Sequence, residues 1–103
     1  MLLQIDFSHA GPFGQEMAAM LAPLAEDIAK TNGLVWKIWT ENEAAKTAAG
    51  IYMFDTHANA QDYLTMHTKR LASFGIADVR ARFFTINQLL SATTHWSPPI
   101  PQG

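Results

Sequence analysis

The chain has 103 residues, of which 49% are hydrophobic and 16% are charged, and its formal net charge is −2 at pH 7. These values predict one folded globular domain, exclude an intrinsically disordered chain and give no reason to expect nucleic acid or an anionic membrane as a partner. The absence of cysteine excludes disulfides, thiolate metal ligands and a cysteine nucleophile.

The N-terminal stretch MLLQIDF has too few consecutive apolar residues for the core of a signal peptide. No apolar run in the chain approaches the roughly 20 residues that a membrane helix needs. We therefore expect a cytoplasmic protein with no membrane partner.

The first half of the chain predicts a strand, a helix and a second strand. Apolar and polar residues alternate over 2–7, as in a strand, and helical spacing of apolar residues over 13–30 predicts a helix that Pro23 bends. After a stop at Gly33, the stretch 34–41 reads LVWKIWTE and predicts the second strand. Strict alternation in that strand would give each face of the sheet one tryptophan.

The second half predicts two more strands on either side of a second helix. A polar loop, ENEAAKTAA, leads to a strand over 50–55, and the expected cap of the following helix is Asp55 or Thr56. That helix turns a stripe of apolar residues, together with His67, towards the core. The last strand is predicted over 78–87.

The resulting order, β-α-β-β-α-β, is typical of the ferredoxin-like α+β fold, a four-stranded antiparallel sheet with both helices on one face. We assign residues 1–90 to this domain and residues 91–103 to a Pro-rich C-terminal tail. Because prolines crowd its end, the chain after the last strand is expected to form an extended arm and neither a helix nor a central strand.

The sheet face away from the helices is predicted to be an exposed apolar patch. Such patches usually mark interfaces, and a second copy of the chain would cover this one around a two-fold axis. We therefore predict a homodimer. The large apolar residues expected on this face are Trp39, Tyr52 or Met53, Phe84 and Ile86. The polar residues there, which would need partners across the interface or bridging water, are Gln4, Asp6, Lys37, Arg80 and Arg82.

Six segments, in this order and spacing, resemble the YdhR-like monooxygenase family of the dimeric α+β-barrel superfamily: LLQIDF, GPFG, PLAEDIA, GLVWKIWTE, GIYMF and HTKRL. The resemblance extends from about Leu2 to about Leu90, and it implies a ferredoxin-like fold, a dimer and monooxygenase activity. Relatives by fold include cofactor-independent oxygenases of polycyclic phenols, haem-degrading oxygenases and lactone isomerases. In several of them the substrate lies between the helices and the sheet.

Three residues are candidates for the centre of the site. His67 would be a general base that takes a proton from a phenolic substrate, and the alternative is a buried histidine bonded to a neighbour. Trp36 would be a flat wall that also donates its indole N–H to a developing oxyanion, and Trp39 would contact the substrate. Alternatively, both tryptophans fill the core and the interface.

Tyr52, Arg80 and Arg82 form a second group of candidates, in which Tyr52 or an arginine, Arg82 first, would be the partner of a substrate anion. Alternatively, these arginines form inter-subunit ion pairs with Asp6 or Glu41. Asp6 would then be half of such a pair, or it would be a substrate-binding carboxylate. His9, in the SHAGPFG loop, would lie at the mouth of the pocket. The four histidines lack the spacing of metal ligands, and we expect no metal or bound cofactor.

The sequence leaves two functions open. The first is a monooxygenase that oxidises a small aromatic or phenolic substrate without a bound cofactor, by deprotonating it so that the anion gives an electron to molecular oxygen. The second is a dimer that binds a small aromatic ligand without turnover, or that binds or degrades haem.

Overall fold

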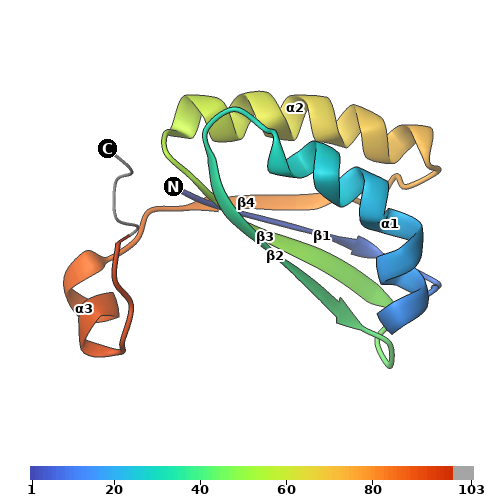
Figure 1. The fold of residues 1–103 in the computed structure, drawn as a ribbon, viewed down its shortest axis with the longest axis horizontal. Helices are drawn as coiled ribbons and strands as arrows, with labels where there is room; N and C mark the ends of the chain where they lie inside the picture. The colour runs from blue at the N-terminus through green and yellow to red at the C-terminus, as the bar shows by residue number, and fades with distance from the viewer. Residues whose placement is uncertain (99–103) are drawn as a thin grey trace.

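The computed structural model describes residues 1–98 as two layers (Figure 1). One layer is a four-stranded antiparallel sheet in the order β2-β3-β1-β4, and the two long helices cover one face of it. The strands are β1 (Leu2–Ser8), β2 (Leu34–Asn42), β3 (Thr47–Phe54) and β4 (Arg80–Phe84), and the helices are α1 (Gly14–Ala29), α2 (His57–Ser73) and α3 (Gln88–Thr93). The predicted ferredoxin-like fold is confirmed.

The two long helices begin and pack as their sequences predict. α1 is a single helix despite Pro23, and its axis bends along its length (Figure 1). Thr56 caps α2, because its hydroxyl accepts a hydrogen bond of 3.1 Å from the backbone N–H of Asn59. The inward side of α2 is buried, as predicted, at Ala60, Tyr63, His67 and Leu71. These residues pack on Leu3, Ile5, Tyr52 and Phe54 of the sheet.

β2 departs from strict alternation at a bulge between Leu34 and Trp36. Leu34 pairs with Phe54 and packs against the core, whereas Trp36 pairs with Met53 on the opposite face. A bulge adds one residue to a strand and so reverses the faces of the residues that follow it. The predictions for β2 are therefore wrong beyond this point: Lys37 and Trp39 face the helices, and Trp36 and Ile38 face away from them.

We call the sheet face away from α1 and α2 the open face. It carries an apolar surface, as predicted, but with different members, since Tyr52 is buried under the helices and Ile86 lies beyond the end of β4. Ile38 and Phe84 on this face are 50% and 47% exposed. By strand register, the apolar residues of the open face are Leu2, Trp36, Ile38, Ile51, Met53 and Phe84.

One ion pair within the chain joins charged residues of the open face. Arg80 forms an ion pair with Asp6 of the neighbouring strand, and Arg82 lies opposite Gln4. Asp6, which was expected to pair with an arginine of a second copy, instead pairs with Arg80 of the same chain. Glu41 was the other carboxylate expected to pair with an arginine. It instead accepts a hydrogen bond of 2.8 Å from the backbone N–H of Gly14, which connects the start of α1 to β2.

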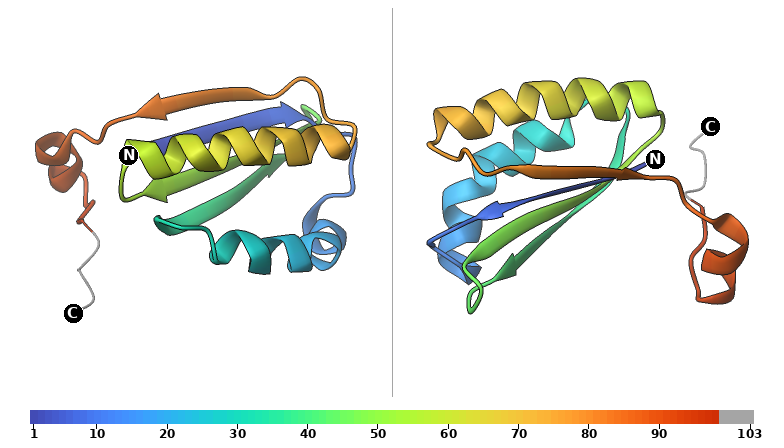
Figure 2. Two further views of the ribbon diagram at one scale, coloured as in Figure 1. Left: turned by 90° about the horizontal axis from the view of Figure 1, so that it is seen from above. Right: turned by 180° about the vertical axis from the view of Figure 1, so that it is seen from behind.

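The prediction that no helix follows the last strand is wrong. α3 begins after Asn87, whose side chain accepts a hydrogen bond of 3.1 Å from the backbone N–H of Leu90. The prolines begin at Pro98, so they lie beyond α3 and do not interrupt it. Figure 2 shows that α3 stands apart from the sheet and from the long helices. The rest of the predicted Pro-rich tail, 99–103, lies outside the described residues.

No helix in the described part of the chain combines the length and the apolar character that crossing a membrane would require.

Gly33 and Gly75 both have positive φ, but only Gly33 also has close neighbours that a side chain would overlap. Gly33 (φ +81°) and Gly75 (φ +85°) both adopt a conformation that disfavours a side chain. A Cβ at Gly33 would also lie 2.4 Å from side-chain atoms of Asp55 and Asn59, whereas nothing lies within 4 Å of one at Gly75. We expect Gly75→Ala to lower the free energy of unfolding by about 1 kcal/mol and Gly33→Ala to lower it by a further 1–3 kcal/mol or so, in urea titrations. Equal losses would contradict the overlap at Gly33.

Candidate functional site

A cavity of about 560 Å³ lies between the long helices and the sheet. Its volume is in the range of small-ligand sites in proteins. Among the described residues, no Asp or Glu lines it, and its walls are largely apolar. The polar side chains in the lining are His9, Lys37, Tyr52 and His67, and the larger apolar ones include Phe7, Met17, Leu21, Leu24, Trp39, Leu71 and Phe74.

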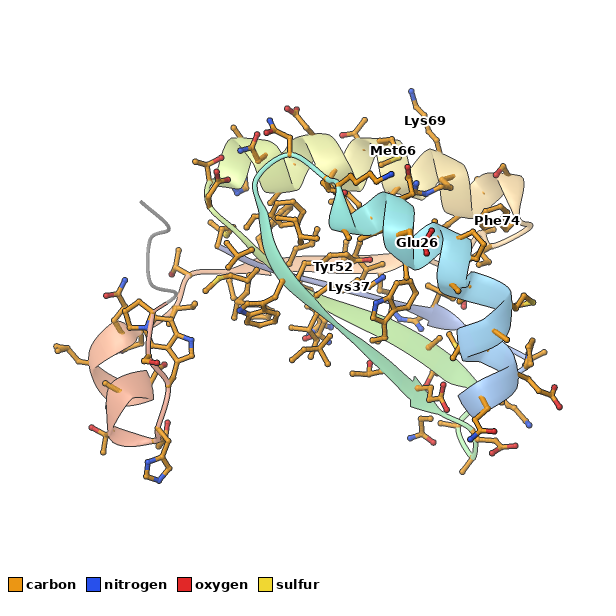
Figure 3. The ribbon with its side chains drawn as sticks, viewed as in Figure 1. Glu26, Lys37, Tyr52, Met66, Lys69 and Phe74 are labelled. Atoms are coloured by element: carbon orange, nitrogen blue, oxygen red, sulfur yellow. The ribbon has the colours of Figure 1, made fainter. Side chains whose placement is uncertain are left out.

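Gly50 on β3 makes room for the polar side chains on the floor of the cavity. A Cβ at this position would lie 2.8 Å from Cε1 of Tyr52 and 2.9 Å from Cε of Lys37. Without one, both side chains lie across the sheet between the strands and the helices (Figure 3). Glycine is therefore needed here for close packing and not for an unusual φ.

The amine of Lys37 lies against two aromatic rings. Its Nζ lies 3.3 Å from the centroid of the Trp39 ring and 4.6 Å from that of Tyr52. Burial, and then the positive charge of Arg70, lower the pKa of Lys37 from 10.5 to about 7. The two aromatic faces act in the opposite direction, because they favour the charged form. Lys37 can therefore exchange a proton near neutral pH, which is the property of an efficient general base.

Arg70 fixes which nitrogen of the His67 ring accepts a hydrogen bond. Its ring is 3% exposed, and Nδ1 lies 3.1 Å from Nε and 3.0 Å from Nη2 of Arg70. Since a guanidinium only donates, Nδ1 accepts and the ring proton is on Nε2. Asp27 on α1 accepts a hydrogen bond of 2.7 Å from Nη1 of Arg70 and so orients it.

Burial, followed by the charges of Arg70 and Lys37, lowers the pKa of His67 to about 3. A histidine that resists protonation is a poor general base at neutral pH. It remains a good hydrogen-bond donor through Nε2–H. The arrangement therefore favours a donor role for His67 over the predicted role as a base.

Two buried tyrosines continue the polar cluster. The Tyr63 hydroxyl donates to the Tyr52 hydroxyl at 3.0 Å, and the Tyr63 ring stacks on His67 with centroids 4.9 Å apart. Burial is the largest cause that raises the pKa of each tyrosine, so both hydroxyls stay protonated. One hydrogen bond between two hydroxyls uses one proton, and the other can be donated to a ligand.

Of the seven site residues that the sequence predicts, the structure brings four to this cavity: His9, Trp39, Tyr52 and His67. His9 lies against the loop before α1, where its Nε2 is 2.7 Å from the carbonyl oxygen of Pro12 and its ring edge meets Phe13. The other three, Asp6, Trp36 and Arg82, are on the open face and do not line the cavity.

Sequence reasoning missed Lys37 and Arg70 as site residues. Arg70 follows His67 by three residues, and this spacing puts both side chains on the same face of a helix, so it could have been found. Lys37 could not be placed without the bulge in β2, because strict alternation assigned it to the open face. The position of Lys37 in the cavity thus depends on the register of β2.

The buried, neutral His67 should make the protein sensitive to acid. Between pH 6.5 and about 3 the unfolded chain binds a proton at this residue and the folded chain does not, so the free energy of unfolding falls as the pH falls. Urea titrations at pH 7 and pH 4.5 would measure this loss in the free energy of unfolding. We expect His67→Gln to make the loss smaller by about 1–3 kcal/mol. The exposed His95 provides the control, and an equal effect of His95→Gln would contradict this origin.

Within residues 1–98, no three His, Cys, Asp or Glu side chains lie close enough together to hold a metal ion.

Comparisons with known proteins place the chain in a family. The family model described as "Putative mono-oxygenase ydhR" matches residues 2–97, a span that includes all the strands, both long helices and α3. No curated protein matches the chain. Because the match covers nearly the whole length, the chain belongs to the family that this description names, "Putative mono-oxygenase ydhR".

Proposed function

We propose that the protein is a monooxygenase that oxidises a small aromatic or phenolic compound in the cavity and needs no resident cofactor. The observation that carries this proposal is Lys37, an amine with a pKa near neutrality in an apolar cavity lined by no carboxylate. Such an amine can take the proton of a phenol and then hold the phenolate as an ion pair. The family match supports the reaction class, and the cavity supports the kind of substrate.

The reaction begins with transfer of the phenolic proton to Nζ of Lys37. The phenolate gives one electron to molecular oxygen, and the resulting radical and superoxide combine at a ring carbon to form a peroxide anion. The protonated Lys37 returns its proton to this anion, which gives a hydroperoxide. Loss of water from that carbon leaves a quinone, so one oxygen atom enters the product and the other leaves as water. For a naphthol, the products are a naphthoquinone and water. The apolar walls stabilise this sequence by excluding solvent from the intermediates.

The other residues of the site bind and orient the substrate. The Trp39 ring provides a flat surface for an aromatic ligand, and it takes the role first assigned to Trp36. His67 and Tyr52 provide N–H and O–H donors for the negative charge that develops on the substrate oxygen. Arg82, on the open face, has no part in this mechanism.

Oxygen uptake with matched substrates tests the proposal. We expect phenols and naphthols to support uptake and their methyl ethers, which have no acidic proton, to support none. With ¹⁸O₂, mass spectrometry should find one labelled oxygen atom in the product. Thermal stabilisation by naphthols without uptake would instead indicate a binding protein. A Soret band that forms with added haem and is lost in His67→Ala would indicate a haem protein.

We also propose that two copies of the chain pack through their open faces. This packing would cover Ile38 and Phe84, which are about half exposed in one chain. The cavity lies on the other side of the sheet, so the packing would leave it accessible. Sedimentation velocity should give the mass of a dimer, and a monomer at micromolar concentration would contradict this packing.

A further inference from the structure

Lys37 differs from the other lysines in its surroundings. Lys30, Lys46 and Lys69 are exposed, and Figure 3 shows Lys69 pointing away from the sheet on the outer side of α2. Lys37 is half-buried and lines the cavity. Within the described residues it forms no ion pair with a carboxylate. Its amine therefore faces a space for a ligand without an anion that would hold it in the charged form.

An amine in this setting is a nucleophile towards carbonyl groups. Lysines that form imines are typically desolvated in apolar pockets or placed next to another cation. Lys37 meets both conditions, because it is buried against Trp39 and Tyr52 and experiences the charge of Arg70. No carboxylate lines the described part of the cavity to compete for its proton.

We propose that Lys37 also captures small aromatic aldehydes as a reversible imine inside the cavity. The amine attacks the carbonyl carbon and a C–N bond forms, giving a carbinolamine after a proton moves from nitrogen to oxygen. Loss of water then gives the imine, so the step needs neither an oxidant nor a reductant. This activity uses the same cavity as the proposed oxidation but does not depend on it, since oxygen takes no part.

The cavity favours this product over the free aldehyde in two ways. The protonated imine is a cation, and it would lie over the rings of Trp39 and Tyr52, which attract a positive charge. The centroids of these rings are 3.3 Å and 4.6 Å from Nζ of Lys37. The apolar walls limit the access of the water that would hydrolyse it. An aromatic aldehyde is the class best suited, because its ring can pack on the same surfaces as a phenolic substrate.

Reductive trapping under argon tests the proposal in the unmodified protein. Benzaldehyde and sodium cyanoborohydride are added at pH 7, and peptide mapping by mass spectrometry locates the benzyl groups. We expect Lys37 to be labelled at least about tenfold faster than Lys69, because far more of it is free amine at this pH. Toluene, which has an aromatic ring and no carbonyl group, should compete for the cavity, slow labelling at Lys37 and leave labelling at Lys69 unchanged.

Equal labelling of Lys37 and the exposed lysines, or labelling of Lys37 that toluene does not slow, would overturn the proposal. Lys37→Met should lose the fast phase of labelling, and Lys69→Met should retain it. Because the result is read in the wild-type protein, a variant that fails to fold does not affect it. Oxygen uptake with naphthols is a separate measurement, so either activity can fail without the other.

Discussion

Lys37→Met should reduce kcat for oxygen uptake with a naphthol by at least about 100-fold, the loss typical of removing a general base. Methionine has a similar length and no charge, so it fills the space over Trp39 and Tyr52 but accepts no proton. The remaining activity should rise with pH, because hydroxide or buffer must then ionise the substrate. Steady-state kinetics between pH 6 and 9 or so would measure both effects.

Two controls accompany this variant. Lys69→Met removes the same charge from the outer side of α2 and should leave kcat unchanged. The pH dependence of the free energy of unfolding should also differ between the wild type and Lys37→Met. In the wild type, the unfolded chain binds a proton at Lys37 between pH 7 and 10.5 and the folded chain does not, so the free energy of unfolding rises with pH in this range. Lys37→Met should lose that rise. Full activity in this variant would exclude Lys37 as the base.

Trp39→Ala should weaken the binding of a naphthol by at least about tenfold, the effect expected when a large aromatic contact surface is removed. Trp36→Ala is the matched control, because it removes the same side chain three residues earlier, on the opposite face of the sheet. We expect it to leave naphthol affinity unchanged and to weaken the association of two subunits instead. Isothermal calorimetry and sedimentation velocity would measure the two effects on both variants.

This pair of variants tests the strand register as well as the site. If β2 alternated strictly, Trp36 would face the cavity and Trp39 the open face. A loss of ligand affinity in Trp36→Ala equal to that in Trp39→Ala would therefore contradict the bulge and the proposed site together. Loss of dimer mass in Trp36→Ala alone would support the proposed packing of the open faces.

The polar groups of the cavity divide the proposed chemistry between them. Burial, reinforced by the charge of Arg70, lowers the pKa values of both His67 and Lys37, and the hydrogen bond from Arg70 to Nδ1 leaves the ring proton of His67 on Nε2. Arg70 thus favours the role of His67 as a hydrogen-bond donor and that of Lys37 as a base. Asp27 fixes this arginine from α1, so the division depends on how the two long helices pack.

The sequence by itself determined the β-α-β-β-α-β order, the ferredoxin-like fold and the inward side of α2, including the inward position of His67. These features depend on local patterns, namely apolar periodicity, glycine and proline stops, and the cap at Thr56, which do not require knowledge of neighbouring strands. The short helix after Asn87 was also within reach, since its cap is local and the prolines follow it.

Only the tertiary structure decided which tryptophan faces the cavity, that Lys37 lies beside it, and that Asp6 pairs with Arg80 of the same chain. The physical reason is that one extra residue in a bulge reverses the faces of all the residues after it, while the local sequence stays compatible with either choice. The pKa values of Lys37 and His67 were equally out of reach, because they depend on burial and on the charge of Arg70 brought close by folding.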